Sequence, residues 1–320
     1  MQNVNIPVPD DVNRILNDLI QHFQTSSDAE TIHHALRLSQ LVASCSSDGV
    51  ARMVNSENKI VSVRLSANPY ASILSENARF RGVHAGQRGF ILCNGESIKQ
   101  QDLTPLRNEI VMTVSNGYLH NDYKVIRPRY HCLPQITYTP IWTRETTVSW
   151  FREMHDQVLS EVIFLSASEC ALIQEEKLFP GRDVRYVDMR LGMAMPTDGA
   201  LFDITRTIPS IQSSPILCLM LMMYMGFKEI YLIGTDHDQI QKGFYKYPFE
   251  PRAVKDADHS VDAAGRPTES MFDQMNSMIS LWTQYRVMKY LANRNGIKIY
   301  NSSNGGMLDE FKRIPLESLF

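Results

Sequence analysis

Several features that would assign a protein class directly are scarce in this sequence. It has five cysteines, an odd number, and no two of them form a Cys-x-x-Cys pair. This pattern favours buried free thiols in a reducing compartment over disulfides or zinc ligands. The apolar run from Ile216 to Met225 is far too short to span a bilayer. The amino terminus has neither a basic region nor an apolar segment, so no signal peptide is expected.

An excess of charge of one sign is also lacking. The chain has 32 basic and 35 acidic residues, and its small net charge of −3 is spread along the sequence. A nucleic-acid partner bound through phosphate neutralisation is therefore not expected. Gly-x-Ser-x-Gly, Walker and His-Glu-x-x-His motifs are absent, which removes the commonest hydrolase, NTPase and metalloprotease interpretations. We expect a cytoplasmic protein, and peripheral association with the inner face of a membrane stays open.

The most informative stretch begins at Ser214. Proline is tolerated at the start of a helix and serine can cap one, so Ser214 and Pro215 predict a helix start. The run from Ile216 to Met225 is apolar on every side, which indicates a helix buried all round. Gly226 is the expected stop, and Glu229–Gly234 is then a short buried strand. In open parallel sheets ligands bind beyond such strand ends, and this chain turns polar there.

Strands and helices alternate from Gly86 onward. The strands are expected at residues 89–93, 109–114, 130–133, 162–165, 183–189, 229–234 and 297–300. A helix from Ser270 to Asn293 precedes the last of them, with Ser270 and Asp273 at capping-box spacing. The alternation predicts an α/β fold with a mostly parallel sheet.

Two segments do not follow this pattern. Residues 1–80 carry a helical stripe from Asp10 to Gln24 and a second helix from Glu30 to Ala43, which predicts a helical appendage ahead of a domain over residues 81–320. The segment 239–269 has no clear periodicity and is rich in aromatic and basic residues. Such long loops are commonly lids or disordered segments, and this composition favours a lid that orders over a ligand.

Asparagines follow the first two strands of the predicted sheet. Asn94, Gly95 and Ser97 come directly after one strand, and Asn116 comes after the next. Glycine allows a close backbone approach, and the polar side chains can bind a sugar, base or phosphate. An ordinary Asn-Gly turn is the alternative. Two such strand ends side by side favour a mononucleotide-binding half.

Charged residues follow the strand at Glu229–Gly234. Asp236 and Asp238 form an Asp-x-Asp pattern, which many glycosyltransferases use to hold a divalent cation on a sugar diphosphate. The alternative is a loop cap at Asp236 with its neighbours solvated. His259, between carboxylates, is a candidate general base, although a lone loop histidine is more often simply exposed. His237, directly after the strand, is a second candidate.

The order of these residues resembles a known family. Asn-Gly-x-Ser after the first strand, Asn-x-Tyr after the second, and Ser214 followed by Gly226-Phe-Lys-Glu-Ile-Tyr-Leu-Ile-Gly-Thr-Asp236 are similar to the small bacterial sialyltransferases of glycosyltransferase family 42. The ending, from Ile297 to Pro315, is similar to the related motility accessory factor family. The resemblance covers Gly86 to about Leu316, and its most specific part is Gly226–Asp236.

This resemblance implies a Rossmann-like domain with a lid and an inverting transfer from a CMP-activated nonulosonic acid to a glycan or protein hydroxyl. It implies that Asn94 and Asn116 contact the cytidylate, with Gln135 and Ser214 also at the nucleotide. Tyr245 and Tyr247 would steady the leaving phosphate, and His259 would be the base. Two departures from the family pattern are Glu96 in the first turn and His237-Asp238 after Asp236.

Three functional hypotheses follow. The first is the CMP-dependent transferase, which requires no cofactor although a divalent cation stays open. The second is a metal-dependent UDP- or GDP-sugar transferase that uses Asp236 and Asp238. The third is a non-catalytic nucleotide- or glycan-binding subunit of an envelope-assembly complex, with the N-terminal helices as its interaction surface. Homo-oligomerisation is compatible with each of them.

Overall fold

The computed structural model describes residues 50–54, 60–64, 68–136, 143–191, 199–242, 248 and 270–320. The chain divides into two compact units, Met1–Pro69 and Tyr70–Phe320. In the first unit, β1 (Val50–Val54) and β2 (Ile60–Arg64) form an antiparallel pair. This strand pair was not part of the predicted helical appendage. The helices predicted within residues 10–43 lie outside the described residues.

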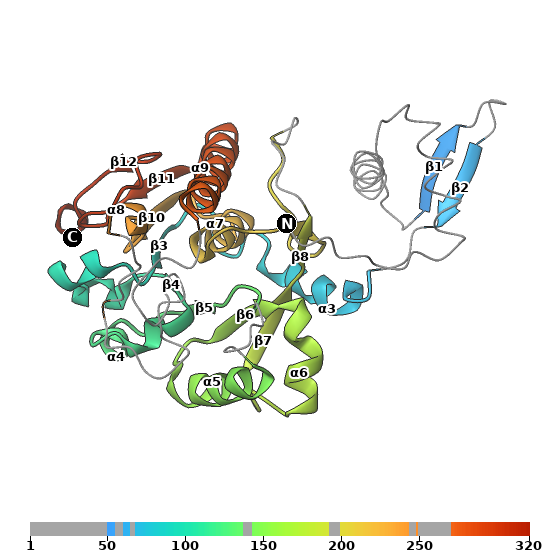
Figure 1. Cartoon of the computed structure of the whole chain (residues 1–320), viewed down its shortest axis with the longest axis horizontal. Helices are drawn as coiled ribbons and strands as arrows, with labels where there is room; N and C mark the ends of the chain where they lie inside the picture. Colours follow the sequence, from blue (N-terminus) through green and yellow to red (C-terminus); the bar gives the residue numbers. More distant parts are fainter. Residues whose placement is uncertain are drawn as a thin grey trace. The chain divides into compact units, whose positions relative to one another are not determined.

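An eight-stranded parallel sheet is the centre of the second unit, in the order β12-β11-β10-β3-β4-β5-β6-β7 (Figure 1). The prediction of a mostly parallel α/β, Rossmann-like sheet is confirmed, and each strand predicted after residue 86 is present. The strands are β3 (Arg88–Leu92), β4 (Val111–Val114), β5 (Tyr130–Cys132), β6 (Val162–Ser166), β7 (Asp183–Val187), β10 (Glu229–Ile233), β11 (Lys298–Asn301) and β12 (Lys312–Arg313).

Helices cover both faces of this sheet, as Figure 1 shows. Helices α7 and α9 pack on one face, and α5 and α6 pack on the other. Side chains alternate between the faces along a strand, so Phe164 of β6 packs in the α7 cluster whereas Ile163 and Leu165 pack with α5. The α-helices are α3 (Ala71–Ser75), α4 (Tyr123–Ile126), α5 (Arg144–Gln157), α6 (Cys170–Glu175), α7 (Ser214–Tyr224), α8 (Gln239–Lys242) and α9 (Met271–Arg294).

Short elements complete the unit. The strand predicted at residues 183–189 is divided, because β8 (Met189–Leu191) leaves the main sheet and pairs with β9 (Ile208–Pro209). The 3-10 helices are η1 (Glu76–Phe80), η2 (Glu96–Gln100), η3 (Thr104–Asn108), η4 (Ser115–Leu119), η5 (Ala167–Glu169) and η7 (Leu316–Leu319). None of the described helices has the length and apolar character needed to cross a lipid bilayer.

Helix α7 is buried on all sides, as its sequence predicts. Every residue from Pro215 to Tyr224 is buried. Gly89 in β3 lets the helix approach the sheet closely, because a Cβ at this position would lie 2.3 Å from Met222 Cε and 2.5 Å from Phe227 Cε1. Each large apolar side chain buried in this way contributes about 1.5–3 kcal/mol to folding.

The ends of α9 and the cysteines also agree with the sequence analysis. Ser270 Oγ accepts a hydrogen bond from the Asp273 backbone N–H and donates one to its carboxylate, so the predicted capping pair is confirmed. The helix ends at Arg294 with Asn295 as its C-cap, one residue beyond the predicted end at Asn293. The described cysteines are free and buried: Cys93, Cys132, Cys170 and Cys218.

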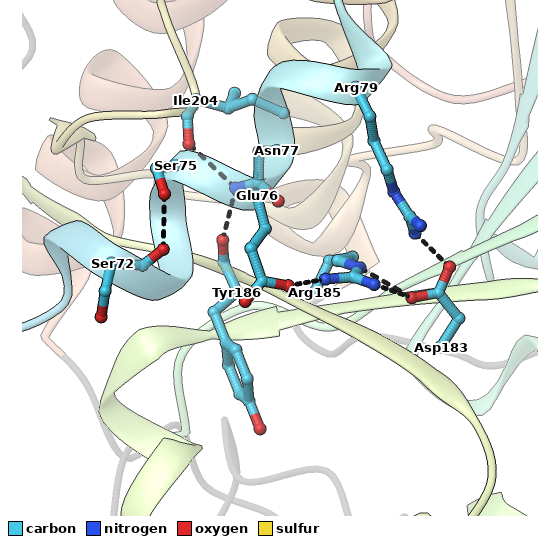
Figure 2. Close-up of polar contacts among 9 residues, drawn as sticks. All are labelled: Ser72, Ser75, Glu76, Asn77, Arg79, Asp183, Arg185, Tyr186 and Ile204. Carbon is cyan, nitrogen blue, oxygen red and sulfur yellow. Dashed lines mark hydrogen bonds and ion pairs between the residues drawn. The ribbon is translucent and has the colours of Figure 1, made fainter.

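The segment α3–η1 covers the edge strand β7 (Figure 2). The Asn77 side-chain amide is buried and donates to Tyr186 O at 2.8 Å and to Ile204 O at 2.9 Å. Ion pairs between Arg79 and Asp183 and between Glu76 and Arg185 flank it. An exposed strand edge is a site of aggregation, and this segment protects it.

Replacing Asn77 with alanine removes the donor that these two carbonyl groups share. We expect Asn77→Ala to lower the free energy of unfolding by about 1–3 kcal/mol, measured by urea denaturation. Ser75→Ala is the matched control, because the exposed Ser75 hydroxyl bonds only within its own turn to Ser72 O and its loss should change stability by less than about 0.5 kcal/mol. Equal stability of the two variants would show that the two hydrogen bonds of Asn77 do not stabilise the fold.

Candidate functional site

A cavity of about 280 Å³ lies at the carboxyl ends of β3, β4 and β10. From β3 the chain builds the sheet in one direction through β4 to β7, and it then returns to place β10 on the other side of β3. The cavity therefore lies at the topological switch point, where open α/β sheets bind their ligands. Its wall consists of Cys93, Asn94, Val114, Ser115, Gln212, Ser213, Ser214, Pro215, Gly234, Thr235, Asp236, His237, Gln239, Ser277, Met278 and Leu281.

The amino-terminal end of α7 forms one side of the cavity. The N-cap residue is Ser213, whose side chain makes no capping hydrogen bond, so the predicted cap by a serine hydroxyl is not formed. Ser214 is the first helical residue and lies on the wall. Pro215 has no N–H group and the Ile216 N–H donates to Ser213 O at 3.0 Å, so an anion here would be attracted mainly by the positive end of the helix dipole. This side of the cavity therefore suits a phosphate.

Gln284 of α9 holds the loop that leads into α7. Its Oε1 accepts from the Gln212 backbone N–H at 2.7 Å, and its Nε2 donates to Ser210 O at 3.1 Å. One side chain thus pairs two backbone groups of a loop that would otherwise lack regular structure. The position of the helix end at the cavity depends on this contact.

Asp236 is buried next to the turn that follows β3. Its Oδ1 accepts from Ser97 Oγ at 2.5 Å and its Oδ2 accepts from the Ser97 backbone N–H at 2.8 Å. A Cβ on Gly95 would lie 2.4 Å from Asp236 Cγ, so only glycine allows this approach. Gly95 and Ser97 do not line the cavity. In the described structure these three residues join the ends of β3 and β10.

The geometry of Asp236 bears on the metal-dependent hypothesis. Both carboxylate oxygens accept hydrogen bonds from Ser97, which fixes the orientation of the carboxylate and leaves each oxygen one further lone pair. Asp238, the second member of the pattern, is half-buried. Within the described residues, no three or more His, Cys, Asp or Glu side chains are grouped so that they could hold a metal ion.

The two strand-end asparagines lie on adjacent strands, as predicted, because β3 pairs with β4. Asn94 lines the cavity, and its Nδ2 donates to Val114 O at 3.1 Å. Asn116 is buried directly after the wall residue Ser115, and its Oδ1 accepts from Trp150 Nε1 at 2.7 Å. Indole N–H is only a donor, so this bond orients the Asn116 amide.

Other predicted residues lie elsewhere. Gln135 is exposed after β5 and is not part of the cavity wall. Tyr245, Tyr247 and His259 are outside the described residues. Of the segment predicted to be a lid, the structure describes α8 and Pro248.

His237 lies on the wall in a left-handed backbone conformation, with a φ of 48°. Its Nε2 is 2.7 Å from the Tyr285 hydroxyl, and its ring meets Trp282 edge-on. Burial lowers the pKa of His237 to about 4, while the neighbouring Asp238 acts in the opposite direction. The ring is therefore neutral near pH 7 and is a weak base.

Sequence reasoning missed the wall residues supplied by α9 and by the entry to α8. Ser277 and Leu281 are four positions apart and Met278 lies between them, which places them on one side of α9. Helical spacing alone indicates a buried face but not which strand ends it covers. The sequence predicts that Gln239 begins a loop, whereas it is the first residue of α8.

No family model and no curated protein sequence matches the chain. Solved structures with a similar fold include the sialyltransferase CstII from Campylobacter jejuni, in complex with the substrate analogue cytidine-5'-monophosphate. The identity is 17%, the TM-score is 0.41, and the match covers 72% of this chain and 85% of CstII. The MAf glycosyltransferase from Magnetospirillum magneticum AMB-1 is 14% identical with a TM-score of 0.43. That match covers 78% of this chain and 39% of MAf. Similarities at this level do not assign an activity.

The lowered pKa of His237 predicts a pH dependence of stability. Its pKa is about 4 in the folded chain and about 6.5 in an unfolded one. Between these values the unfolded chain binds the proton more strongly, so the free energy of unfolding falls as the pH decreases through this range. We expect His237→Gln to lose less stability than the wild type between about pH 7 and about pH 5, measured by urea denaturation at both values.

The comparison with the wild type isolates His237, because burial also lowers the pKa values of His84, His120 and His131. These residues contribute to the pH dependence of both proteins. An identical loss of stability in both proteins would show that His237 is not buried in its neutral form.

Proposed function

We propose that this chain is an inverting glycosyltransferase that moves a nonulosonic acid from a CMP-activated donor to a hydroxyl of a glycan or protein. The observation that carries the proposal is the cavity at the switch point. Its wall contains Asn94, the amino-terminal end of α7 and the strand end Gly234–Asp236. These are the segments in which the sequence resembles the sialyltransferases of family 42 and their relatives.

The cavity chemistry fits a nucleotide monophosphate donor. The Asn94 amide on the wall can exchange hydrogen bonds with a base or ribose, and Asn116, buried beside the wall, is proposed to contact the nucleotide as well. The amino-terminal end of α7 can stabilise the phosphate that leaves with the nucleotide. Tyr245 and Tyr247 are proposed to add hydroxyl donors to that phosphate, and Gln135 is proposed to contact the nucleotide.

The proposed reaction is a single displacement. The acceptor hydroxyl oxygen forms a bond to the anomeric carbon as the bond from that carbon to the phosphate oxygen breaks. CMP leaves with the electron pair, and the hydroxyl proton passes to a base. An attack on the face opposite the leaving group inverts the anomeric configuration.

His259 is proposed as that base. His237, the other candidate, is bonded through Nε2 to Tyr285, and burial lowers its pKa to about 4. A general base is most effective when its pKa lies near the working pH, so His237 is poorly suited to the role. We assign His237 to shaping the cavity wall.

The donor class is tested by incubating the protein with CMP-nonulosonate, UDP-sugar and GDP-sugar donors and measuring the nucleotide released. We expect release of CMP alone, and we expect it to persist in EDTA, because the donor carries one phosphate, whose charge tyrosine hydroxyls and a helix end can stabilise. Release of UDP or GDP that EDTA abolishes and manganese restores would favour the metal-dependent hypothesis. Release of no nucleotide at all would favour a binding subunit.

The base assignment is tested with two variants. We expect His259→Ala to lower turnover by roughly 10²–10⁴-fold while nucleotide affinity, measured by calorimetry, stays nearly unchanged. His237→Ala is the comparison, and its turnover should fall much less. The reverse pattern, with His259→Ala close to the wild type, would move the base to the strand end.

A further inference from the structure

Several polar groups on the cavity wall already have partners inside the protein. The Asp236 carboxylate, His237 Nε2 and Asn94 Nδ2 each make the contacts given above. A group of this kind must exchange one hydrogen bond for another when it meets a ligand, and the exchange contributes little to binding. The groups without a partner are therefore the ones that can select a ligand.

Gln239, the first residue of α8, carries such a group. Its side-chain oxygen Oε1 is buried and accepts no hydrogen bond, and among the described wall residues no other buried side-chain N or O atom lacks a partner. Its Nε2 donates to Met278 Sδ at 3.7 Å. A thioether sulfur can accept a hydrogen bond but cannot donate one. The Gln239 amide therefore has its nitrogen toward Met278 and its oxygen away from it. The orientation of Oε1 follows from this contact.

Buried polar atoms in native proteins are nearly always paired, and each exception needs an explanation. We infer that Gln239 is a specificity residue whose Oε1 accepts a hydrogen bond from the bound nucleotide, through the exocyclic amine of the base or the ribose 2'-hydroxyl. The inference rests on the proposed function and deepens it, because it assigns one side of the same cavity to the nucleoside.

The chemistry of Oε1 excludes the phosphate as its partner. A phosphodiester offers acceptor oxygens and no donor at neutral pH, so it would repel a carboxamide oxygen. The positive end of the α7 helix dipole lies on another part of the same wall and attracts an anion. The phosphate then lies toward α7, and the donor groups of the base and ribose lie toward Gln239.

Gln239→Met tests this assignment, because methionine has a similar volume and no strong acceptor. In the wild-type protein a ligand donor satisfies Oε1, so the variant should bind CMP about 5- to 150-fold more weakly, equivalent to about 1–3 kcal/mol, by titration calorimetry. The melting temperature without ligand should stay the same or rise, because the variant no longer buries an unpaired acceptor. Gln241→Met, at an exposed position of the same helix, is the matched control and should change neither value.

Titrations with UMP and 2'-deoxyCMP separate the two sources of the donor. If the amine is the partner, Gln239→Met should weaken CMP and reduce the preference for CMP over UMP. If the 2'-hydroxyl is the partner, the variant should weaken CMP and UMP alike and leave 2'-deoxyCMP unchanged. Either pattern supports the inference.

A purely structural role gives a different result, with a lower melting temperature in the absence of ligand and an equal loss for every nucleotide. That outcome overturns the inference, as does wild-type affinity in Gln239→Met. Gln239→Leu provides a second variant with the same expectations if the methionine variant folds poorly. Wild-type protein that binds none of the three nucleotides would overturn the proposed function as well, whereas a change confined to the variants concerns Gln239 alone.

Discussion

The parallel pairing of β10 with β3 is the constraint on which the rest of the large unit depends. It joins residues 229–233 to residues 88–92, and it places the carboxyl ends of both strands at one edge of the sheet. The chain returns from β7 to β10 through α7, which is buried on all of its sides. Gly89 makes that burial possible because a side chain there would overlap Met222 and Phe227. The amino-terminal end of α7 is carried to the same edge, so the cavity is a consequence of the topology.

The cavity is held in shape by contacts that do not themselves line it. Ser97 donates two hydrogen bonds to Asp236, which joins the turn after β3 to the end of β10. Gln284 of α9 pairs two backbone groups of the loop before α7. Trp150 of α5 orients the amide of Asn116. These bonds come from three residues that are far apart in the sequence, Ser97, Trp150 and Gln284, and none of the three lines the wall. Gln239 Oε1 is the buried wall acceptor that has no partner among the described residues.

Burial changes the chemical meaning of the acidic and basic residues after β10. In the sequence, Asp236, His237 and Asp238 could be a metal site, a base or a solvated turn. In the structure, the Asp236 carboxylate accepts two hydrogen bonds from Ser97. His237 packs against Trp282 and Tyr285, and burial lowers its pKa. Both have become parts of the wall, because desolvation favours neutral or fully paired groups at a buried strand end. The proposed reaction therefore takes its base from elsewhere and its phosphate contacts from a helix end.

Local sequence patterns identified the strands β3 to β7, β10 and β11 in their order, whereas β12 and the small sheets were not predicted. Glu229–Gly234 is apolar and short, Ile216–Met225 is apolar on every side, and Ser270 and Asp273 have capping spacing, so local physics identified a strand and two helices. It also placed Asn94 and Asn116 at strand ends that lie side by side. The tertiary structure decided what each polar residue does, since hydrogen-bond partners such as Ser97 for Asp236 and Tyr285 for His237 lie far away in the chain. The tertiary structure also pairs residues 189–191 with β9 in a separate small sheet, and it places α9 and Gln239 at the cavity. Local patterns report burial and periodicity, whereas the partner of a buried polar group is set only when distant segments pack together.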